Sequence, residues 1–437
     1  MSGRGADSSH ISNISLRAAQ HMLSIDTAAS AHRVPVTAQT KKPPRPTYSE
    51  IGTGLIISGA FVAAILGFII PYWNTGARLS PLDSTVYLQH TTPIIPSGGD
   101  HSRHGHNTSL PNITIFATGG TIPGQSISPT NNGNYDLTAS AQDLLAAMPE
   151  IKTYANIQTR QLSQVLSTDL TQQTLLTLQR AVAAELAKQE VTGVVITHGT
   201  DTLEETCFHL ELTINTSKPI VCAAATRPAT ALSADGAANL LQSVVLATAA
   251  NGRDRGVMII VNDKISSAFF AAKNPASHAN TFYNAEVGTI GYFLDHRPYF
   301  YFTPSRAVGA PYLDISSARS LPQVEILYSH PEQNPGLVEA AVQLGAKGIV
   351  FAANGDGSVP VGVLKAAEVV QRKGVVVVVT YKVPNGCAVP SGIAIASAHL
   401  NPVKARILLR VALARGMDHG RICALFDRLR PDPWTVC

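Results

Sequence analysis

Short apolar runs alternate with longer amphipathic segments from residue 112 onward. Buried strands are predicted by apolar, β-branched runs at residues 112–117, 191–197, 219–225 and 256–261. Helices are predicted between them, by the helical spacing of apolar residues at 170–189 and 202–212. Strands that alternate with helices favour a mostly parallel sheet covered on both faces. This part of the chain is therefore expected to be an α/β domain.

A second alternation of the same kind begins near Leu321. It predicts strands at 323–327, 348–352 and 374–380, and helices at 335–344, 361–372 and 402–415. The stretch 303–320 has no apolar period and contains prolines and a glycine, as is typical of a linker. We expect two α/β domains, at residues 111–302 and 321–437, joined by this linker.

The first 110 residues carry a different pattern. Residues 1–50 sustain no apolar period and are expected to form a disordered cytosolic tail. Residues 51–70 contain no charged side chain, and twenty residues of helix span roughly 30 Å, the thickness of membrane hydrocarbon. Residues 51–72 are therefore predicted to be a single transmembrane anchor, with a buried core helix or a cleaved signal peptide as alternatives. Residues 73–110 have the composition of a linker.

Charge sets the predicted orientation of this anchor. Residues 1–50 hold six Lys and Arg against three Asp and Glu. The positive-inside rule then places the N-terminus in the cytosol and the body in an extracellular or lumenal space; secretion after cleavage is the alternative. On that topology, three sequons mark candidate glycosylation sites at Asn107, Asn112 and Asn215.

Composition narrows the class of function. Charged residues make up only 14% of the 437 residues, and the net charge of +4 lies largely in the tail. A near-neutral body gives no electrostatic footprint for nucleic acid, so we expect no nucleic-acid partner. The five cysteines have no C-x-x-C spacing, which argues against a zinc knot. We interpret His101, His104 and His106 as part of a polar linker, because no fourth metal ligand lies nearby.

Two predicted strands end in Gly-Thr sequences, at 119–121 (Gly-Gly-Thr) and 199–201 (Gly-Thr-Asp). Ligands of open α/β sheets bind outside the carboxyl ends of the strands. A threonine hydroxyl on a loop next to glycines can be approached by a substrate and by backbone N–H groups, as a nucleophile with an oxyanion site requires. A tight turn explains the same residues. Candidate bases are His198, Tyr135 and Lys273, and spacing does not choose among them.

The second of these sequences leads directly into the helix predicted at 202–212. Asp201 or Thr202 stands in position to cap that helix, and Glu204 or Glu205 follows within its first turn. The Gly-Thr loop is therefore expected to be held at a helix start.

Four segments together closely resemble the bacterial-type L-asparaginases: PNITIFATGGTIPG (111–124), VVITHGTDTLEET (194–206), TRPATALSADG (226–236) and LNPVKARILL (400–409). The first two are the signature blocks of that family, and the similarity extends from about residue 110 to near the C-terminus. The resemblance implies hydrolysis of L-asparagine to L-aspartate and ammonia without a metal or other cofactor. It also implies a larger N-terminal and a smaller C-terminal α/β domain, and a homotetramer whose sites combine domains of two subunits.

Carried over residue by residue, the resemblance assigns a catalytic role to five residues. Thr121 is the expected nucleophile, forming an acyl-enzyme, and Tyr135 the residue that hydrogen-bonds its hydroxyl. Thr200, Asp201 and Lys273 form the expected second catalytic group, in which Lys273 moves a proton on and off hydroxyl groups.

The resemblance also identifies substrate-binding residues. Ser167 matches the serine that holds the substrate α-carboxylate, Thr168 stands where the family often has glutamine, and Asp201 matches the carboxylate that pairs with the α-ammonium group. Asp356 takes the place of an asparagine usually supplied by a neighbouring subunit. The loop after Pro384 lacks the glutamate that many relatives use. An L-asparaginase is the leading hypothesis; a glutaminase-asparaginase or related amidohydrolase, or an inactive amino-acid-binding relative, are the alternatives.

Overall fold

The structure is a computed structural model that describes residues 109–130, 132–133, 135–137, 139–283, 286–390, 392 and 394–430. Several predicted features lie outside these residues: the tail, the anchor at 51–72, nearly all of the linker at 73–110, Asn107 and the three histidines of that linker. Within the described ranges, no helix combines the length and the apolar character that crossing a membrane requires.

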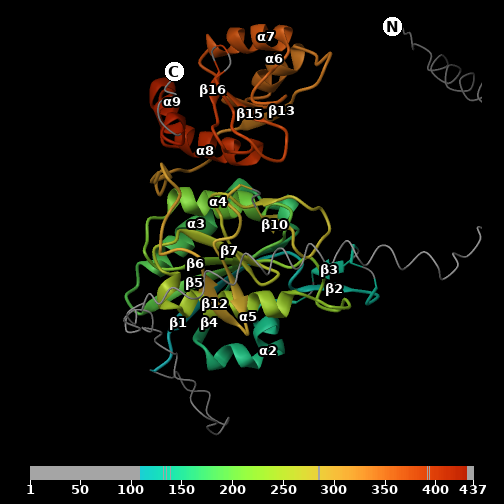
Figure 1. The fold of residues 1–437 in the computed structure, drawn as a ribbon, viewed down its shortest axis with the longest axis vertical. Coiled ribbons are helices and arrows are strands. Elements are labelled where there is room, and N and C mark those ends of the chain that lie inside the picture. Colours follow the sequence, from blue (N-terminus) through green and yellow to red (C-terminus); the bar gives the residue numbers. More distant parts are fainter. Residues whose placement is uncertain are drawn as a thin grey trace, which may run out of the picture. The chain divides into compact units, whose positions relative to one another are not determined.

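The larger sheet has eight strands in the order β12-β11-β8-β7-β6-β5-β1-β4 (Figure 1). Its parallel part consists of β1 (Asn112–Gly119), β4 (Asn156–Val165), β5 (Val191–Thr197), β6 (Ile220–Ala223) and β7 (Val257–Val261). It is extended by the antiparallel strands β8 (Lys264–Ser267), β11 (Gly291–Leu294) and β12 (Arg297–Phe300). The four predicted strands are β1, β5, β6 and β7, whereas β4 and the antiparallel strands were not predicted.

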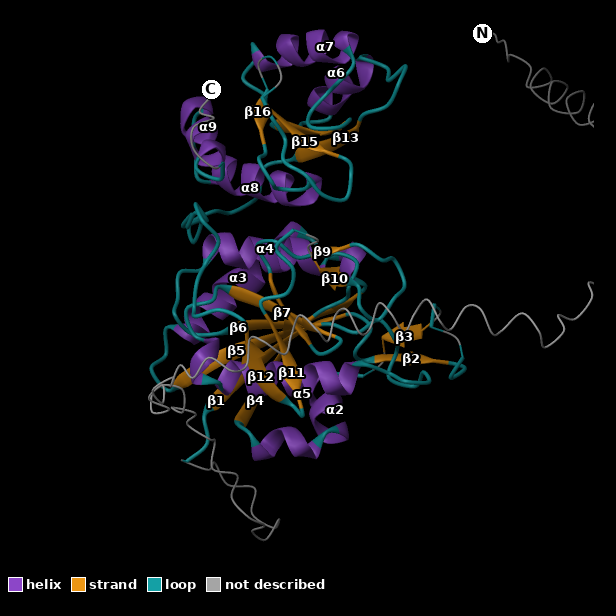
Figure 2. Cartoon of the chain, in the orientation of Figure 1, coloured by secondary structure: helices purple, strands orange, loops and turns teal. Residues whose placement is uncertain are grey.

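Side chains of these strands alternate between two cores. On β1, Phe116 belongs to a core with α3 (Gln172–Leu186) and α4 (Leu203–Thr213). Ile113 and Ile115 belong to a second core, with α5 (Gly236–Thr248). Figure 2 shows α3 and α4 on one side of the sheet and α5 on the other. Both faces are covered, which explains why the strands are continuous apolar runs.

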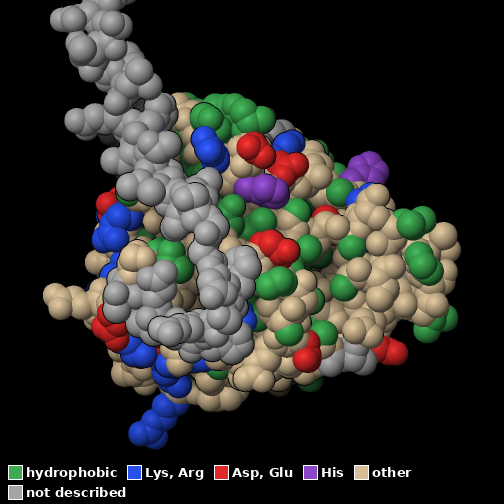
Figure 3. Space-filling view, turned by 90° about the horizontal axis from the view of Figure 1, so that it is seen from below, with side chains coloured by type: hydrophobic (Ala, Val, Ile, Leu, Met, Phe, Trp, Pro, Cys, Tyr) green, Lys and Arg blue, Asp and Glu red, His purple; other side chains and the backbone are tan. Residues whose placement is uncertain are grey.

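Shorter elements complete this domain. They are α2 (Ala141–Ala147), the 3-10 helices η2 (Pro149–Thr153), η3 (Ser167–Asp169) and η4 (Ala250–Gly252), and the strand pairs β2 (Gly124–Ser126) with β3 (Tyr135–Leu137) and β9 (Ala272–Lys273) with β10 (Phe282–Tyr283). On the face in Figure 3, most of the surface is uncharged; Lys and Arg side chains gather toward the left and lower left, while Asp and Glu side chains are spread over it.

The smaller sheet has four parallel strands, β13 (Val324–Tyr328), β14 (Gly348–Ala353), β15 (Val376–Tyr381) and β16 (Ile395–Ala396). Its helices are α6 (Gly336–Gln343), α7 (Val361–Gln371), α8 (Pro402–Ala414) and α9 (His419–Asp427). Every element predicted here is present, and only β16 and α9 were missed. The described residues between β12 and β13, where the linker was predicted, form no helix or strand. The two-domain α/β architecture is therefore confirmed.

Helix α8 joins the two domains. It packs against α4, and one hydrophobic core contains Phe208 and Leu212 of α4 together with Leu408 of α8. Across the same interface, Arg406 pairs with Glu205 at 3.1 Å.

His209 of α4 is buried at this interface, and its ring makes no hydrogen bond among the described residues. Burial lowers the pKa of His209 from 6.5 to about 3, with the charge of Arg410 adding to the effect. The imidazole is therefore neutral in the folded protein throughout the physiological range.

We predict that His209→Leu makes the fold less sensitive to acid. Because the pKa of this histidine is lower in the folded than in the unfolded chain, its stability contribution is complete above pH 6.5 and is lost as pH falls toward 3. Between about pH 7 and about pH 4.5, the contribution of His209 to the free energy of unfolding falls by about 2–3 kcal/mol in the wild type. The variant lacks this contribution and its loss. Chemical denaturation at the two pH values measures it. His278→Gln, at an exposed position, is the control; equal acid sensitivity of wild type and His209→Leu would contradict the prediction.

Candidate active site

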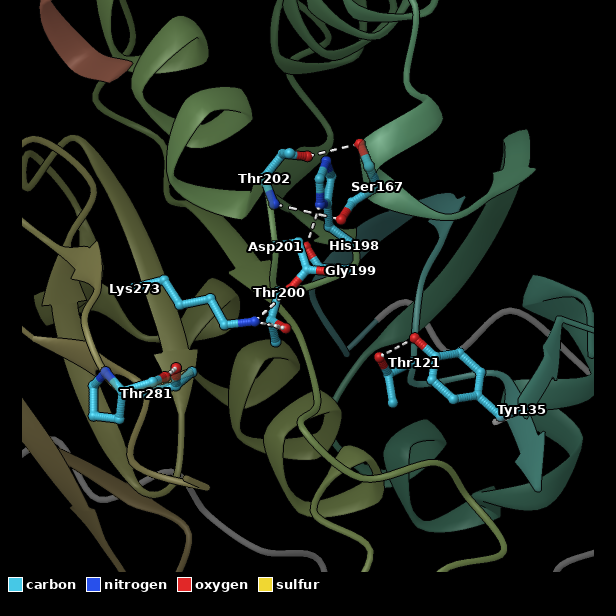
Figure 4. A network of polar contacts seen from close by, with 11 residues as sticks. Thr121, Tyr135, Ser167, His198, Gly199, Thr200, Asp201, Thr202, Lys273 and Thr281 are labelled. Carbon is cyan, nitrogen blue, oxygen red and sulfur yellow. Dashed lines mark hydrogen bonds and ion pairs between the residues drawn. The ribbon is translucent and has the colours of Figure 1, made fainter. Parts of the chain in front are cut away.

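Three neighbouring parallel strands each lead into a residue with a hydroxyl group. β4, β1 and β5 lie side by side in the sheet, and Ser167, Thr121 and Thr200 follow their respective carboxyl ends. All three residues are buried. Figure 4 shows the three residues in the same region of the domain as Tyr135 and Lys273. The strand-end location inferred from the sequence thus brings these hydroxyl groups to one edge of the sheet.

Glycines allow the two Gly-Thr loops to touch backbone to backbone. A Cβ on Gly120 would lie 2.2 Å from the backbone nitrogen of Gly199, and Gly120 has a φ of +85°. A Cβ on Gly199 would lie 2.8 Å from Ser167 Oγ. Any side chain at these positions would separate the loops. The glycines therefore fix the spacing between the segments that carry Thr121 and Thr200.

Thr121 forms a hydroxyl pair with Tyr135. Its Oγ1 lies 2.9 Å from the Tyr135 hydroxyl oxygen, and either group can donate. Tyr135 begins β3, whose partner β2 starts at Gly124. A Cβ on Gly124 would lie 2.6 Å from Cδ2 of the tyrosine ring. This glycine thus makes room for the ring that brings the phenol to Thr121.

Lys273 connects Thr200 with Asp201. Its Nζ donates to Thr200 Oγ1 at 2.9 Å and to Asp201 Oδ1 at 2.5 Å. The Lys273 side chain is 16% exposed and that of Asp201 61% exposed, so the lysine is enclosed while its carboxylate partner faces solvent. The structure therefore joins Lys273 in one hydrogen-bonded group with the adjacent residues Thr200 and Asp201, which lie more than 70 positions earlier in the sequence.

His198 is not available as a base. Its ring is fully buried, with Nδ1 at 2.7 Å from the Gly199 carbonyl oxygen and Nε2 at 2.8 Å from Thr206 Oγ1. Burial lowers the pKa of His198 to about 4. Both ring nitrogens are thus engaged with the scaffold, and of the three candidate bases only Tyr135 and Lys273 contact the hydroxyls of Thr121 and Thr200.

The predicted substrate-binding residues are placed differently. Ser167 belongs to the site: its Oγ accepts from the Thr202 backbone N–H at 3.4 Å, and its carbonyl oxygen accepts from the Thr202 hydroxyl at 2.8 Å. Thr168 is exposed next to it. Asp356 is exposed in a turn after β14, and among the described residues no hydrogen bond joins its side chain to those around Thr121.

Thr202 has a role that the sequence did not predict. It occupies the N-cap position of α4, as expected, but its side chain makes no capping hydrogen bond. Its hydroxyl instead binds Ser167, shortly after β4. Because the β4 sequence NIQTRQLSQV is largely polar, the apolar pattern did not predict that strand. The contact between Thr202 and Ser167 therefore could not be predicted from that pattern.

Comparison with known proteins identifies the family. The family model "Asparaginase, N-terminal" matches residues 112–306, and the model "Glutaminase/Asparaginase C-terminal domain" matches residues 323–426. The chain belongs to the asparaginase family. It is an amidohydrolase of the L-asparaginase type, acting on linear amides, and the resemblance seen in its signature blocks is confirmed.

Individual relatives cover the same part of the chain. "Probable L-asparaginase 1" of Schizosaccharomyces pombe is 41% identical over 323 residues, 74% of this chain and 90% of that protein. "Glutaminase-asparaginase" of Pseudomonas fluorescens biotype A is 35% identical over 329 residues, 73% of this chain and 91% of that protein. A solved structure, a probable cytoplasmic L-asparaginase from Campylobacter jejuni, is 36% identical with a TM-score of 0.70, covering 73% of this chain and 99% of that one.

These findings correct the location predicted from the sequence. The solved relative is described as cytoplasmic, and no described helix is fit to cross a membrane. The prediction of a membrane-anchored, extracellular or lumenal body was therefore wrong. Glycosylation, which depended on it, has no support. Of the sequons within the described residues, Asn112 uses its side chain to donate to the Glu190 carbonyl oxygen and to accept from Asn156, and Asn215 is exposed.

We predict that Gly120→Ala destroys activity while a matched glycine substitution does not. The added methyl group would overlap the Gly199 backbone and push the loops apart. Gly374 has a similar φ, +89°, but a Cβ there would meet no atom of the described structure within 4 Å beyond its chain neighbours. Gly374→Ala therefore carries only the backbone penalty of about 1–2 kcal/mol. Amide hydrolysis and thermal unfolding of both variants measure the difference; full activity of Gly120→Ala would refute the packing argument.

Proposed function

We propose that this protein hydrolyses L-asparagine to L-aspartate and ammonia, with Thr121 as the nucleophile. The proposal depends on one observation: two loops in backbone contact each carry a threonine whose hydroxyl is hydrogen-bonded. Thr121 is bonded to Tyr135, and Thr200 to Lys273. Relatives named as L-asparaginases support the choice of substrate.

In the first step, Thr121 Oγ1 attacks the carboxamide carbon and a C–O bond forms. Tyr135 accepts the threonine proton and gives its own to the leaving nitrogen, so that the C–N bond breaks and ammonia departs. The product is an aspartyl ester on Thr121. Backbone N–H groups beside the two threonines face the oxygen that becomes negative, an arrangement in which each donor contributes about 3–4 kcal/mol.

In the second step, water attacks the ester. Thr200, hydrogen-bonded by Lys273, orients the water; its hydroxyl relays the water's proton, and the Lys273 ammonium stabilises the negative charge that develops. The new C–O bond replaces the ester bond, and Thr121 recovers its proton. The second group thus serves deacylation, with Asp201 holding Lys273 in place.

Substrate recognition follows from the same edge of the sheet. We assign the substrate α-carboxylate to Ser167 and Thr168 and the α-ammonium group to Asp201. Asp356 belongs to this set only if it is supplied by a neighbouring subunit, since in its own chain it makes no contact with the described site. We therefore propose a homotetramer, with domains at 111–302 and 321–437 that pair across subunits.

A glutaminase-asparaginase is the second candidate. It is favoured by the 35% identity to the enzyme of that name. Release of ammonia from L-asparagine and from L-glutamine by the same preparation separates the two candidates. A protein that binds either amino acid without releasing ammonia would refute both.

We predict that Thr121→Ala lowers kcat for L-asparagine by about 10³-fold or more, the scale seen when a nucleophile is removed. Thr121→Ser keeps the hydroxyl and retains measurable turnover. Ammonia release under saturating substrate is the measurement. Wild-type turnover by Thr121→Ala would exclude Thr121 as the nucleophile.

We predict that Tyr135→Phe lowers kcat by about 10²–10⁴-fold, the usual contribution of a positioned proton-transfer group. The ring remains to pack on Gly124, so the fold is kept and only the hydroxyl contact with Thr121 is lost. Circular dichroism and steady-state kinetics of the purified variant check this. Unchanged kcat would remove Tyr135 from the first step.

A further inference from the structure

A cavity of about 220 Å³ lies where the helices α3 and α4 end. Three segments form its wall. The C-terminal half of α3 contributes Gln179 and Leu186, and the end of α4 contributes Thr213 with the following Ile214. The stretch 312–316, between β12 and β13, contributes Asp314. The cavity therefore has a mixed wall, with apolar side chains between polar ones.

This cavity is distinct from the candidate active site. α4 begins directly after the loop with Thr200 and Asp201, and the cavity lies at the other end of that helix, beside Thr213. The helix has 11 residues, a length of roughly 16 Å at the usual rise per residue. The residues that contact Thr121 or Lys273 are not among those that line the cavity. A ligand here would leave the site of hydrolysis open.

The carboxamide of Gln179 gives this cavity an unmet hydrogen-bond acceptor. The residue is 3% exposed, and its Oε1 is buried without a hydrogen-bond partner in the described part of the chain. A polar atom buried in this way lowers the stability of a protein unless a donor reaches it. Because Gln179 lines the cavity, a ligand bound there can supply the donor. The buried end of the cavity therefore favours an N–H or O–H group.

The rest of the wall favours positive charge. α3 ends at Leu186 and α4 is capped by Ile214, both in the cavity wall, and the C-terminus of a helix carries about half a negative charge. Asp314 adds a carboxylate that is exposed to solvent. Among the described residues, no Lys, Arg or His lines the cavity. Lys218 donates through Nζ to the carbonyl oxygen of Leu186 at 3.0 Å, so this helix end already binds one ammonium group.

Basic side chains hold the loops of the wall from outside the cavity. Arg180 donates to the carbonyl oxygens of Ser316 and Ala318, and Arg306 donates to the carbonyl oxygen of Thr216. Neither arginine lines the cavity. Their guanidinium groups are thus engaged with the backbone, and they fix the two loops between which a ligand would enter.

We propose that this cavity binds a small aliphatic diamine. One ammonium group donates to Gln179 at the buried end, and the other pairs with the exposed Asp314. The methylene chain between them packs on Leu186 and Ile214. A volume of about 220 Å³ holds roughly seven groups of the size of a water molecule, at about 30 Å³ each, which is enough for putrescine. The argument does not use the reaction proposed at Thr121.

Calorimetric titration of the full-length protein with putrescine tests the proposal. We expect saturable binding to the wild type and weaker binding of two molecules of similar length, n-butylamine with one ammonium group and butanediol with none. These comparisons need no substitution, so they do not depend on the folding of a variant. Gln179→Leu and Asp314→Asn remove the two proposed partners, and each is expected to weaken putrescine binding by about 10-fold. Their melting temperatures without ligand show whether they fold.

Two variants serve as controls. Glu332→Gln removes an exposed carboxylate of the smaller domain that does not line the cavity, and Asp201→Asn removes the exposed carboxylate of the candidate active site. Both are expected to bind putrescine as the wild type does. The inference is overturned if putrescine shows no saturable binding, if butanediol binds equally well, or if folded Gln179→Leu or Asp314→Asn keeps the wild-type affinity. Loss of binding in Asp201→Asn would place the ligand in the active site, and loss in Glu332→Gln would indicate unspecific attraction to carboxylates; either result refutes the proposed site.

Discussion

The close contact between Gly120 and Gly199 is the constraint on which the site depends. Parallel pairing of β1 with β5 brings the two loops to the same edge of the sheet, but only residues without a Cβ allow their backbones to meet. Each loop then presents a threonine with its own partner, Tyr135 or Lys273. The chemistry we propose needs two such groups within reach of one carboxamide, and this contact supplies that proximity.

The fold was largely predictable because its strands are buried on both faces. Runs such as VTGVVIT of β5 are apolar for most of their length, and the structure gives their side chains alternately to two cores. Two of the strands that escaped prediction, β4 and β12, lack this signal. β4 is partly exposed and polar, and β12, at the edge of the sheet, is exposed at alternate residues. Strands that bury one face at most have sequences that resemble loops.

The site was predictable in part, and for different reasons. The Gly-Thr sequences at strand ends pointed to Thr121 and Thr200 by physical argument alone, but Tyr135 and Lys273 were distinguished only by resemblance. They come from short strands outside the main sheet, and no periodicity indicates where such strands fold back. The exclusion of His198 required its burial and both of its hydrogen bonds. Contacts of this kind are properties of the folded chain.

The most direct test of the account is to locate the covalent intermediate. The Lys273→Met variant, in which deacylation is expected to be slowed, is mixed with L-asparagine, quenched in acid and digested, and its peptides are analysed by mass spectrometry. The account predicts an aspartyl ester on the peptide that carries Thr121, absent when Thr121 is also replaced by alanine. An ester on Thr200 with none on Thr121 would contradict it.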